Sequence, residues 1–298
     1  MPSAKILCLH KISDVRYPSW PAMPLNTFEK LLKYVSRHYD VCLPQDLITQ
    51  KSKKNRLILT FDDGYEDFYL YAWPLLNKYH LPAVLNVVAG CINGKLEIWT
   101  QRLNDTLDAY AKNDSLLYFE LNGTHFKYHV NEDNAEMIAL GIYRKLLPLN
   151  EQDRLKVLEN IEKNTPAPVV KTPMLSSSQL AELTKNGVMI GSHSLSHINL
   201  KELSLTDEML WNEIVLSKEK LQDITSENID TFAFPNGMYN ERSLKFARDG
   251  GYKYILLVND KTASYNINDN PLLLDRILVY ASKHWKNLIR IEKNRFSL

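Results

Sequence analysis

Two adjacent carboxylates, Asp62 and Asp63, come directly after the apolar segment 57–61 and directly before Gly64. Charge at the end of a buried strand is costly, and crowded carboxylates raise one another's pKa unless a cation lies beside them. The pair therefore suits a metal ligand next to a general base. The alternative is a solvated Asp-Asp-Gly turn that caps the following helix, and the spacing is compatible with both.

Two histidines, His193 and His197, follow a second apolar segment, 188–191, and stand four residues apart. If the chain coils there, this spacing puts both imidazoles on one side, where their nitrogens suit Zn²⁺ or a similar divalent ion. Together with Asp63 they would form a His₂Asp ligand set that leaves positions open for water and substrate. The alternative is two surface histidines in a polar loop.

These carboxylates and histidines can meet only if the strands that precede them end at the same edge of a sheet. Short aliphatic or β-branched segments recur along the chain, at 5–9, 57–61, 83–88, 188–193, 231–235, 254–258 and 276–279. Most of them lack polar alternation, which is typical of parallel strands that are covered on both faces. Segments of helical period lie between several of the strands, which predicts an α/β fold with a parallel sheet or barrel.

Three of the intervening segments carry helix signals. We expect one helix from about Asn26, where Glu29 three residues later completes the spacing of a capping box. Further helices are expected at 206–221 and at 241–249, where the second of these ends before a pair of glycines. The repeated order of strand and helix supports the α/β assignment.

One long stretch between the strands at 83–88 and 188–193 interrupts this order. Within it, segments 116–121 and 124–130 flank Asn122-Gly123, which is a strong hairpin signal. Helical segments follow near 135–147 and 151–163. We expect a single domain over residues 1–298 with an α+β insertion at approximately 91–172.

The overall charge and the cysteines exclude several classes of protein. The chain has 36 Lys and Arg against 35 Asp and Glu, a formal net charge of +1, so no overall field would draw it to nucleic acid or an anionic membrane. Cys8, Cys42 and Cys91 are odd in number and lie in or beside apolar runs, which favours free thiols in a reducing compartment. The N-terminus lacks a signal-peptide pattern and no apolar stretch is long enough to span a membrane, so we expect a cytoplasmic location.

The two chemical groups resemble motifs of a known family. Thr60-Phe-Asp-Asp-Gly64 and His193-Ser-Leu-Ser-His197 are similar, in this order, to the first two motifs of the polysaccharide deacetylases, carbohydrate esterase family 4. The segment that begins at Pro173 also resembles that family. The resemblance covers about the first 90 residues and those from about 173 onward, and it leaves the insertion unmatched.

This resemblance implies a distorted (β/α)₇ barrel, which agrees with the strand segments identified above. It also implies metal-dependent hydrolysis of an acetamido or acetyl ester group on a sugar. By position, Asp62 would be the general base, while Asp63, His193 and His197 would hold one divalent ion, with Zn²⁺ expected.

The third motif departs from the family pattern of Arg, Pro, an aromatic residue and Gly. Ala233 stands where the Arg is expected, and Asn236 occupies the aromatic position. This variant is similar to the subgroup that includes poly-N-acetylglucosamine deacetylases. We expect Arg276 in the last strand to replace the missing Arg, His10 at the end of the first strand to act as the acid, and the Asn236 backbone N–H to bind the oxyanion.

The expected protein is a carbohydrate deacetylase acting on an acetylated sugar of a glycan or glycan precursor, with an N-acetyl group as the target. A nucleotide-linked or lipid-linked precursor in surface-polysaccharide biosynthesis fits a cytoplasmic location. The alternative is a degenerate family member that binds glycan without hydrolysis. A two-metal phosphoesterase or nuclease is disfavoured, because the sequence has neither a second carboxylate cluster nor a basic patch.

Overall fold

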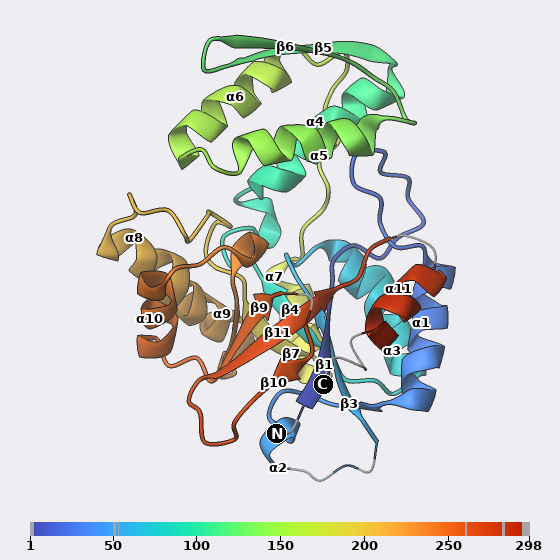
Figure 1. Cartoon of the computed structure of the whole chain (residues 1–298), viewed down its shortest axis with the longest axis vertical. Coiled ribbons are helices and arrows are strands. Elements are labelled where there is room, and N and C mark those ends of the chain that lie inside the picture. Colours follow the sequence, from blue (N-terminus) through green and yellow to red (C-terminus); the bar gives the residue numbers. More distant parts are fainter. Residues whose placement is uncertain (1–2, 50–51, 53, 260, 282–283, 294–298) are drawn as a thin grey trace. The chain divides into compact units, whose positions relative to one another are not determined.

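The computed structural model describes residues 3–49, 52, 54–259, 261–281 and 284–293 (Figure 1). The chain divides into two compact units. Unit 1 comprises residues 1–14, 23–96 and 174–298, and unit 2 comprises residues 15–22 and 97–173. The stretch expected as an insertion falls largely within unit 2, which also takes in residues 15–22.

Unit 1 is a closed parallel barrel. Among the described residues it consists of seven parallel strands: β1 (Ser3–Leu9), β3 (Arg56–Phe61), β4 (Val84–Val87), β7 (Met189–Ser192), β8 (Thr231–Ala233), β9 (Tyr254–Val258) and β11 (Leu272–Leu278). Their order is β1-β11-β9-β8-β7-β4-β3, and β3 pairs again with β1 from Ala4↔Arg56 to Leu9↔Phe61, which closes the barrel. The predicted (β/α)₇ barrel is confirmed, and each expected strand segment lies on one of these strands.

Two short strands extend the barrel sheet. β2 (Asp40–Val41) pairs in parallel with β3, and β10 (Ala263–Ser264) pairs antiparallel with β1. β1 therefore has β3 on one side, and β10 and β11 at different heights on the other. β1 is the strand at which the barrel closes.

Helices lie between the strands and after the last one, and they surround the barrel (Figure 1). They are α1 (Leu25–His38), α2 (Asp46–Thr49), α3 (Trp73–Lys78), α7 (Ser177–Lys185), α8 (Asp207–Trp211), α9 (Ser217–Thr225), α10 (Glu241–Asp249) and α11 (His284–Lys293). Single π-turns, η1 (Phe68–Ala72) and η3 (Asn212–Leu216), precede α3 and join α8 to α9. The helix predicted at 206–221 is thus present, with a π-turn in its middle.

The capping box predicted at Asn26 and Glu29 is wrong. α1 begins at Leu25 after Pro24, and neither Asn26 nor Glu29 caps its first turn; the Leu25 N–H donates instead to Asp14 Oδ1 at 2.9 Å. The carboxylate of Glu29 instead accepts hydrogen bonds from Lys78 Nζ and Tyr79 Oη, both at 2.7 Å. A contact with residues distant in sequence has replaced the local one that the spacing indicated.

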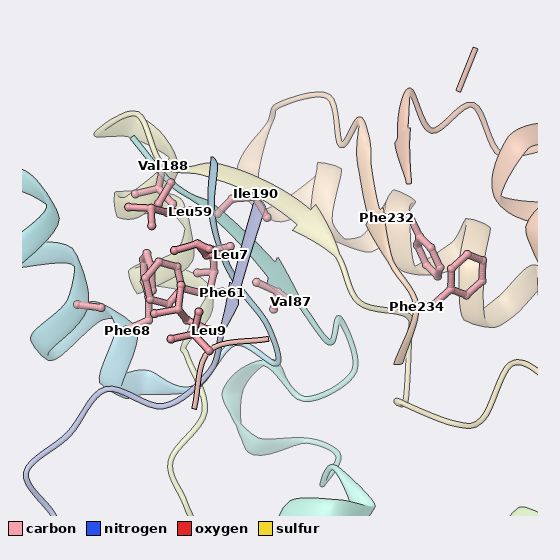
Figure 2. Packing of buried hydrophobic residues seen from close by; sticks show 14 of the residues in the cluster. Leu7, Leu9, Leu59, Phe61, Phe68, Val87, Val188, Ile190, Phe232 and Phe234 are labelled. Atoms are coloured by element: carbon pink, nitrogen blue, oxygen red, sulfur yellow. The ribbon is translucent and has the colours of Figure 1, made fainter. Parts of the chain in front are cut away.

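The barrel strands and their helices share one apolar layer. Leu7 and Leu9 of β1 lie beside Leu59 and Phe61 of β3, as Figure 2 shows, and all four are at most 1% exposed. Phe28 of α1 packs edge-on against Phe61, with ring centroids 5.8 Å apart. This layer fixes α1 to the strand that ends at the two aspartates.

Unit 2 has a core of its own. It contains α4 (Trp99–Lys112), the hairpin β5 (Ser115–Leu121) and β6 (Thr124–Val130), α5 (Ala135–Leu146) and α6 (Glu151–Lys163). The hairpin turn at Asn122 (φ 51°) and Gly123 (φ 75°) has the two left-handed residues that its sequence predicts. Helix α4 was not expected from the sequence.

No helix among the residues that the structure describes is both long and apolar enough to cross a membrane.

Removing the Phe28 ring should destabilise unit 1. Phe28 is fully buried, so Phe28→Ala is expected to lower the free energy of unfolding by about 3–5 kcal/mol, because it leaves a cavity against Phe61. Urea denaturation measures this change. Leu203→Ala, at a side chain that is 90% exposed, is the control and should change stability by less than about 0.5 kcal/mol. Equal effects of the two substitutions would contradict the packing described here.

Candidate active site and metal centre

The side chains of the site point into the barrel because alternate residues of each strand face inward. Alternate residues of a barrel strand point inward, and the inward-facing layer of unit 1 is apolar at one level: Ile6, Ile58, Val84 and Leu274. Two residues further along the same strands stand polar side chains that are at most 1% exposed: Cys8, Thr60, Asn86 and Arg276. The next position after β3 is Asp62, and the next after β1 is His10. Polar groups thus replace apolar ones at the carboxyl end of the barrel.

Asp62 and Arg276 form a buried ion pair. Arg276 Nη1 donates to Asp62 Oδ1 at 2.7 Å, and Nη2 donates to Oδ2 at 2.8 Å. The guanidinium is fully buried, and the carboxylate is 3% exposed. Arg276 also donates to Thr60 Oγ1 and to the Leu257 carbonyl, so four of its hydrogen bonds are accounted for. This two-point geometry orients the carboxylate as well as balancing its charge.

The pair controls the charge of Asp62. Burial alone would raise the pKa of this carboxyl, but the guanidinium of Arg276, with a smaller contribution from His193, lowers the pKa well below its usual range. Burial likewise disfavours the charged guanidinium, while Asp62 raises the pKa of Arg276. Each charge is retained in the barrel because the other is present. Asp62 is therefore an anion across the physiological pH range.

Two further donors contact Asp62. Asn86 Nδ2 donates to Oδ1 at 2.7 Å, and Cys8 Sγ lies 3.4 Å from Oδ2. Asn86 is fully buried, and a Cβ added at Gly191 would lie 2.2 Å from its Oδ1, so a glycine at 191 makes room for the amide. Asn86 was not predicted from the sequence. The available signal was a single amide within the apolar run 83–88.

Asp63, His193 and His197 converge on one point. Asp63 Oδ1 lies 3.5 Å from the Nε2 atoms of both histidines. The Nδ1–H of His193 donates to the Ala233 carbonyl at 2.7 Å, which leaves the Nε2 lone pair facing Asp63. The structure therefore brings together the three residues that the sequence analysis grouped as metal ligands.

These three side chains have the properties of a ligand set. All are at most 4% exposed, and Asp63 Oδ1 has no hydrogen-bond partner among the described residues. Burial and the neighbouring charge of Asp62 raise the pKa of Asp63 to about 7. Burial lowers the pKa of both histidines. A divalent cation would compensate the buried carboxylate, and one oxygen with two imidazole nitrogens suits Zn²⁺.

The backbone at the site adopts unusual conformations. Asp63 (φ 78°), Ser194 (φ 69°) and His197 (φ 62°) are left-handed residues other than glycine. Gly64 follows with φ 84°, and a Cβ there would lie 2.8 Å from Val87 Cγ1. Left-handed conformations cost free energy for these residue types and concentrate at functional sites. The left-handed backbone of Asp63 turns its side chain away from that of Asp62. The Asp63 carboxylate therefore faces the two histidines, whereas the Asp62 carboxylate faces Arg276.

His10 and Asn236 lie at the ends of β1 and β8. The ligand-type atoms of His10, Cys8 and Asp62 are all within 4.8 Å of one another. Burial is the main cause that lowers the pKa of His10 to about 4, so the half-buried imidazole is neutral near pH 7. Asn236 (φ 54°) lies in a 3₁₀ turn, Pro235–Gly237, which follows the strand whose Ala233 carbonyl holds His193.

Comparison with known proteins points to one family. Residues 49–255 match the family model described as polysaccharide deacetylase. A curated relative, YxkH of Bacillus subtilis (strain 168), is 22% identical over 254 residues, which cover 83% of this chain and 62% of that protein. The chain thus spans less than two thirds of the length of this relative.

Solved structures show the same fold at low identity. The deacetylase PplD of Streptococcus pyogenes, solved with acetate, has a TM-score of 0.63 at 19% identity and covers 97% of both chains. A de-N-acetylase of Aggregatibacter actinomycetemcomitans has a TM-score of 0.59 at 15% identity, covering 97% of this chain and 99% of that one. IcaB of Ammonifex degensii has a TM-score of 0.59 at 15% identity, covering 97% and 96%. At these low sequence identities the similarity shows a shared fold and no more.

Breaking the buried pair should be costly. Arg276→Met leaves the Asp62 carboxylate buried without its cation, so the free energy of unfolding should fall by about 3–5 kcal/mol. Chemical denaturation measures this, and adding Asp62→Asn to Arg276→Met should restore part of the loss. Arg242→Met, which breaks a more exposed pair with Asp207, should cost no more than about 1 kcal/mol. An unchanged stability of Arg276→Met would contradict the coupling.

Proposed function

The chain belongs to the polysaccharide deacetylase family, and we propose that it is a metal-dependent hydrolase that removes an acetyl group from a sugar of a glycan or glycan precursor. One observation carries the proposal: the convergence of Asp63, His193 and His197 next to an Asp62 carboxylate that Arg276 keeps ionised. A ligand set beside a fixed anion is the arrangement that metal-assisted hydrolysis requires.

Asp63, His193 and His197 would hold one divalent ion, with Zn²⁺ favoured by the donor types. Such an ion supplies a polarised acyl carbonyl and a water acidified toward a pKa of about 7. The His193–Ala233 hydrogen bond supports this assignment, because it fixes the tautomer in which Nε2 is free to bind.

Asp62 would take the proton of the attacking water. Its Oδ1 already accepts from Arg276 and Asn86, whereas Oδ2 accepts from Arg276, contacts the Cys8 thiol and lies 4.0 Å from His193 Nε2. Oδ2 is therefore the oxygen nearer to the ligand set and the proposed proton acceptor. Since Asp62 is a weak base in this environment, it would hold the proton only briefly.

His10 would carry the proton onward to the leaving group. The imidazole of His10 is neutral near pH 7 because burial lowers its pKa, and its ring nitrogen lies within 4.8 Å of the Asp62 carboxyl, so it is placed to accept that proton. His10 then donates this proton to the leaving nitrogen as the C–N bond breaks, giving an amine and acetic acid, which ionises to acetate. The backbone N–H of Asn236 is proposed to donate to the oxyanion that precedes this step.

The target is proposed to be an N-acetyl group. This choice is supported by a protein of similar fold, the de-N-acetylase of Aggregatibacter actinomycetemcomitans. An amide also has the greater need for the acid that His10 would provide. A cytoplasmic role in surface-polysaccharide biosynthesis remains part of the proposal. We propose the acetylated sugar without a stated carrier, because no feature of the described residues is specific for a lipid-linked one.

A second candidate function is binding of an acetylated glycan without hydrolysis. The buried Asp62–Arg276 pair supports hydrolysis over this alternative. Burying two charges is costly, and a perturbed ionisable pair beside a ligand set is typical of a catalytic site.

Acetate release tests the proposal. The purified chain should release acetate from N-acetylated oligosaccharides, lose this activity with a chelator and regain it when Zn²⁺ is returned. O-acetylated sugars in the same panel separate amide from ester hydrolysis. Binding of the glycan with no acetate released under any metal condition would support the binding protein instead.

The metal set can be tested without substrate. His193→Ala should lose the bound ion, because it removes one of three protein ligands. Elemental analysis measures the loss, and His125→Ala, at an exposed histidine on β6, should keep the full metal content. Full metal content in His193→Ala would contradict the assignment of His193 as a metal ligand.

The role of His10 predicts a dependence on the leaving group. His10→Ala should slow hydrolysis of an N-acetyl sugar by about 10²-fold or more, because an amine must be protonated to leave. Hydrolysis of an aryl acetate, which has a good leaving group, should change little. Equal losses on both substrates would indicate a positioning role, and no loss on either would remove His10 from the mechanism.

A further inference from the structure

The loop between the two histidines has a constrained backbone. Ser194 and His197 both have positive φ angles, and Ser194 Oγ accepts the backbone N–H of His197 at 3.0 Å. The backbone conformation of residues 194–196 therefore sets the position of the His197 imidazole relative to His193. Groups that bind this loop are in a position to set the geometry of the ligand set.

A buried carboxylate binds the N–H side of the loop. Glu213 Oε2 accepts from the backbone N–H of Leu195 at 3.2 Å and of Ser196 at 3.0 Å. Glu213 Oε1 accepts from the Ser196 hydroxyl at 2.5 Å. Glu213 is 6% exposed, so these charge-assisted hydrogen bonds are largely shielded from water.

The carbonyl side of the loop is held by the segment after β4. The backbone N–H of Ala89 donates to the Ser194 carbonyl at 3.0 Å, and that of Gly90 donates to the Leu195 carbonyl at 2.8 Å. A Cβ added at Gly90 would lie 2.5 Å from the Leu195 carbonyl oxygen. The loop is thus bound on opposite sides, by Glu213 and by a close backbone contact.

A π-turn presents Glu213 to the loop. Glu213 lies in η3, which interrupts the helical run from α8 to α9. The Ile214 carbonyl within this turn accepts from Tyr252 Oη at 2.7 Å and from Ser217 Oγ at 2.9 Å. Side chains therefore satisfy a carbonyl of the turn. Single π-turns within helices are frequent at functional sites.

We propose that Glu213 is a positioning residue for the metal centre: its carboxylate binds the loop between the two histidines and so fixes His197 for metal binding. The inference rests on the metal set named in the proposed function. The carboxylate supplies the acceptors for two part-buried N–H groups and one hydroxyl, and weakening these bonds frees the loop to move to other partners. Groups that orient metal ligands in this way contribute strongly to metal affinity.

The test is a Co²⁺ titration of the metal-free chain, with visible absorption reporting the coordination geometry. Glu213→Gln removes the charge and replaces one of the two acceptor oxygens by an NH₂ donor, so it should weaken Co²⁺ binding by about 10- to 100-fold and change the absorption spectrum of the bound ion. Glu208→Gln, at an exposed carboxylate on α8, is the matched control and should bind within about twofold of the wild type.

Ser196→Ala provides a milder variant. It removes the hydroxyl bonded to Oε1 and keeps both backbone N–H bonds to Oε2, so it should weaken Co²⁺ binding measurably but less than Glu213→Gln. Circular dichroism establishes that each metal-free variant is folded. Should Glu213→Gln not fold, Ser196→Ala decides the question, and wild-type affinity in that variant would overturn the proposal.

Other outcomes are equally decisive. A folded Glu213→Gln with wild-type affinity and spectrum would overturn the positioning role. Weaker binding with an unchanged spectrum would do so as well, because it would assign the effect to the lost charge alone. A wild-type chain that binds no Co²⁺ would overturn both the metal set and this inference. The titration does not depend on acetate release, so failure of the proposed hydrolysis alone would leave its result unchanged.

Discussion

The buried Asp62–Arg276 pair is the interaction on which the site depends. Asp62 follows β3 and Arg276 lies on β11, and these two strands flank β1 on opposite sides. The pair therefore forms only when the barrel closes at β1. Each charge would be expensive alone in the interior, so the fold and the ionised carboxylate are coupled. Asn86 completes the polar layer by donating to the same carboxylate.

The adjacent carboxylates have opposite environments. Asp62 faces a guanidinium, which lowers its pKa, whereas burial and the neighbouring anion raise the pKa of Asp63 to about 7. The left-handed backbone at Asp63 separates the two side chains, although they are consecutive in sequence. Pairs whose environments push their pKa values apart are typical of sites in which one group is an anion and the other awaits a cation or proton.

Strand patterns in the sequence predicted a parallel sheet or barrel, and the resemblance to the deacetylases implied its seven-stranded form. Apolar runs located the strands, and residues at their ends that the sequence analysis grouped lie together in the structure: Asp62 with Arg276, and Asp63 with the two histidines. Their roles in metal binding and catalysis stay predictions. Asn86 was missed, because it lies inside an apolar run and only the inward-facing register shows its direction. Helix α4 was missed for a related reason, since it buries polar side chains such as Gln101, which obscure its helical period. Glu29 was misassigned because distant residues bind it.

We propose that Asp62 acts as a base beside an ion that it does not need to hold. Metal content and acetate release measured together on Asp62→Asn test this most directly. We predict a variant that retains one ion per chain, as judged by elemental analysis, and loses about 10²- to 10⁴-fold in turnover of an N-acetyl sugar. Near-normal turnover, or loss of the ion with the carboxylate, would contradict it.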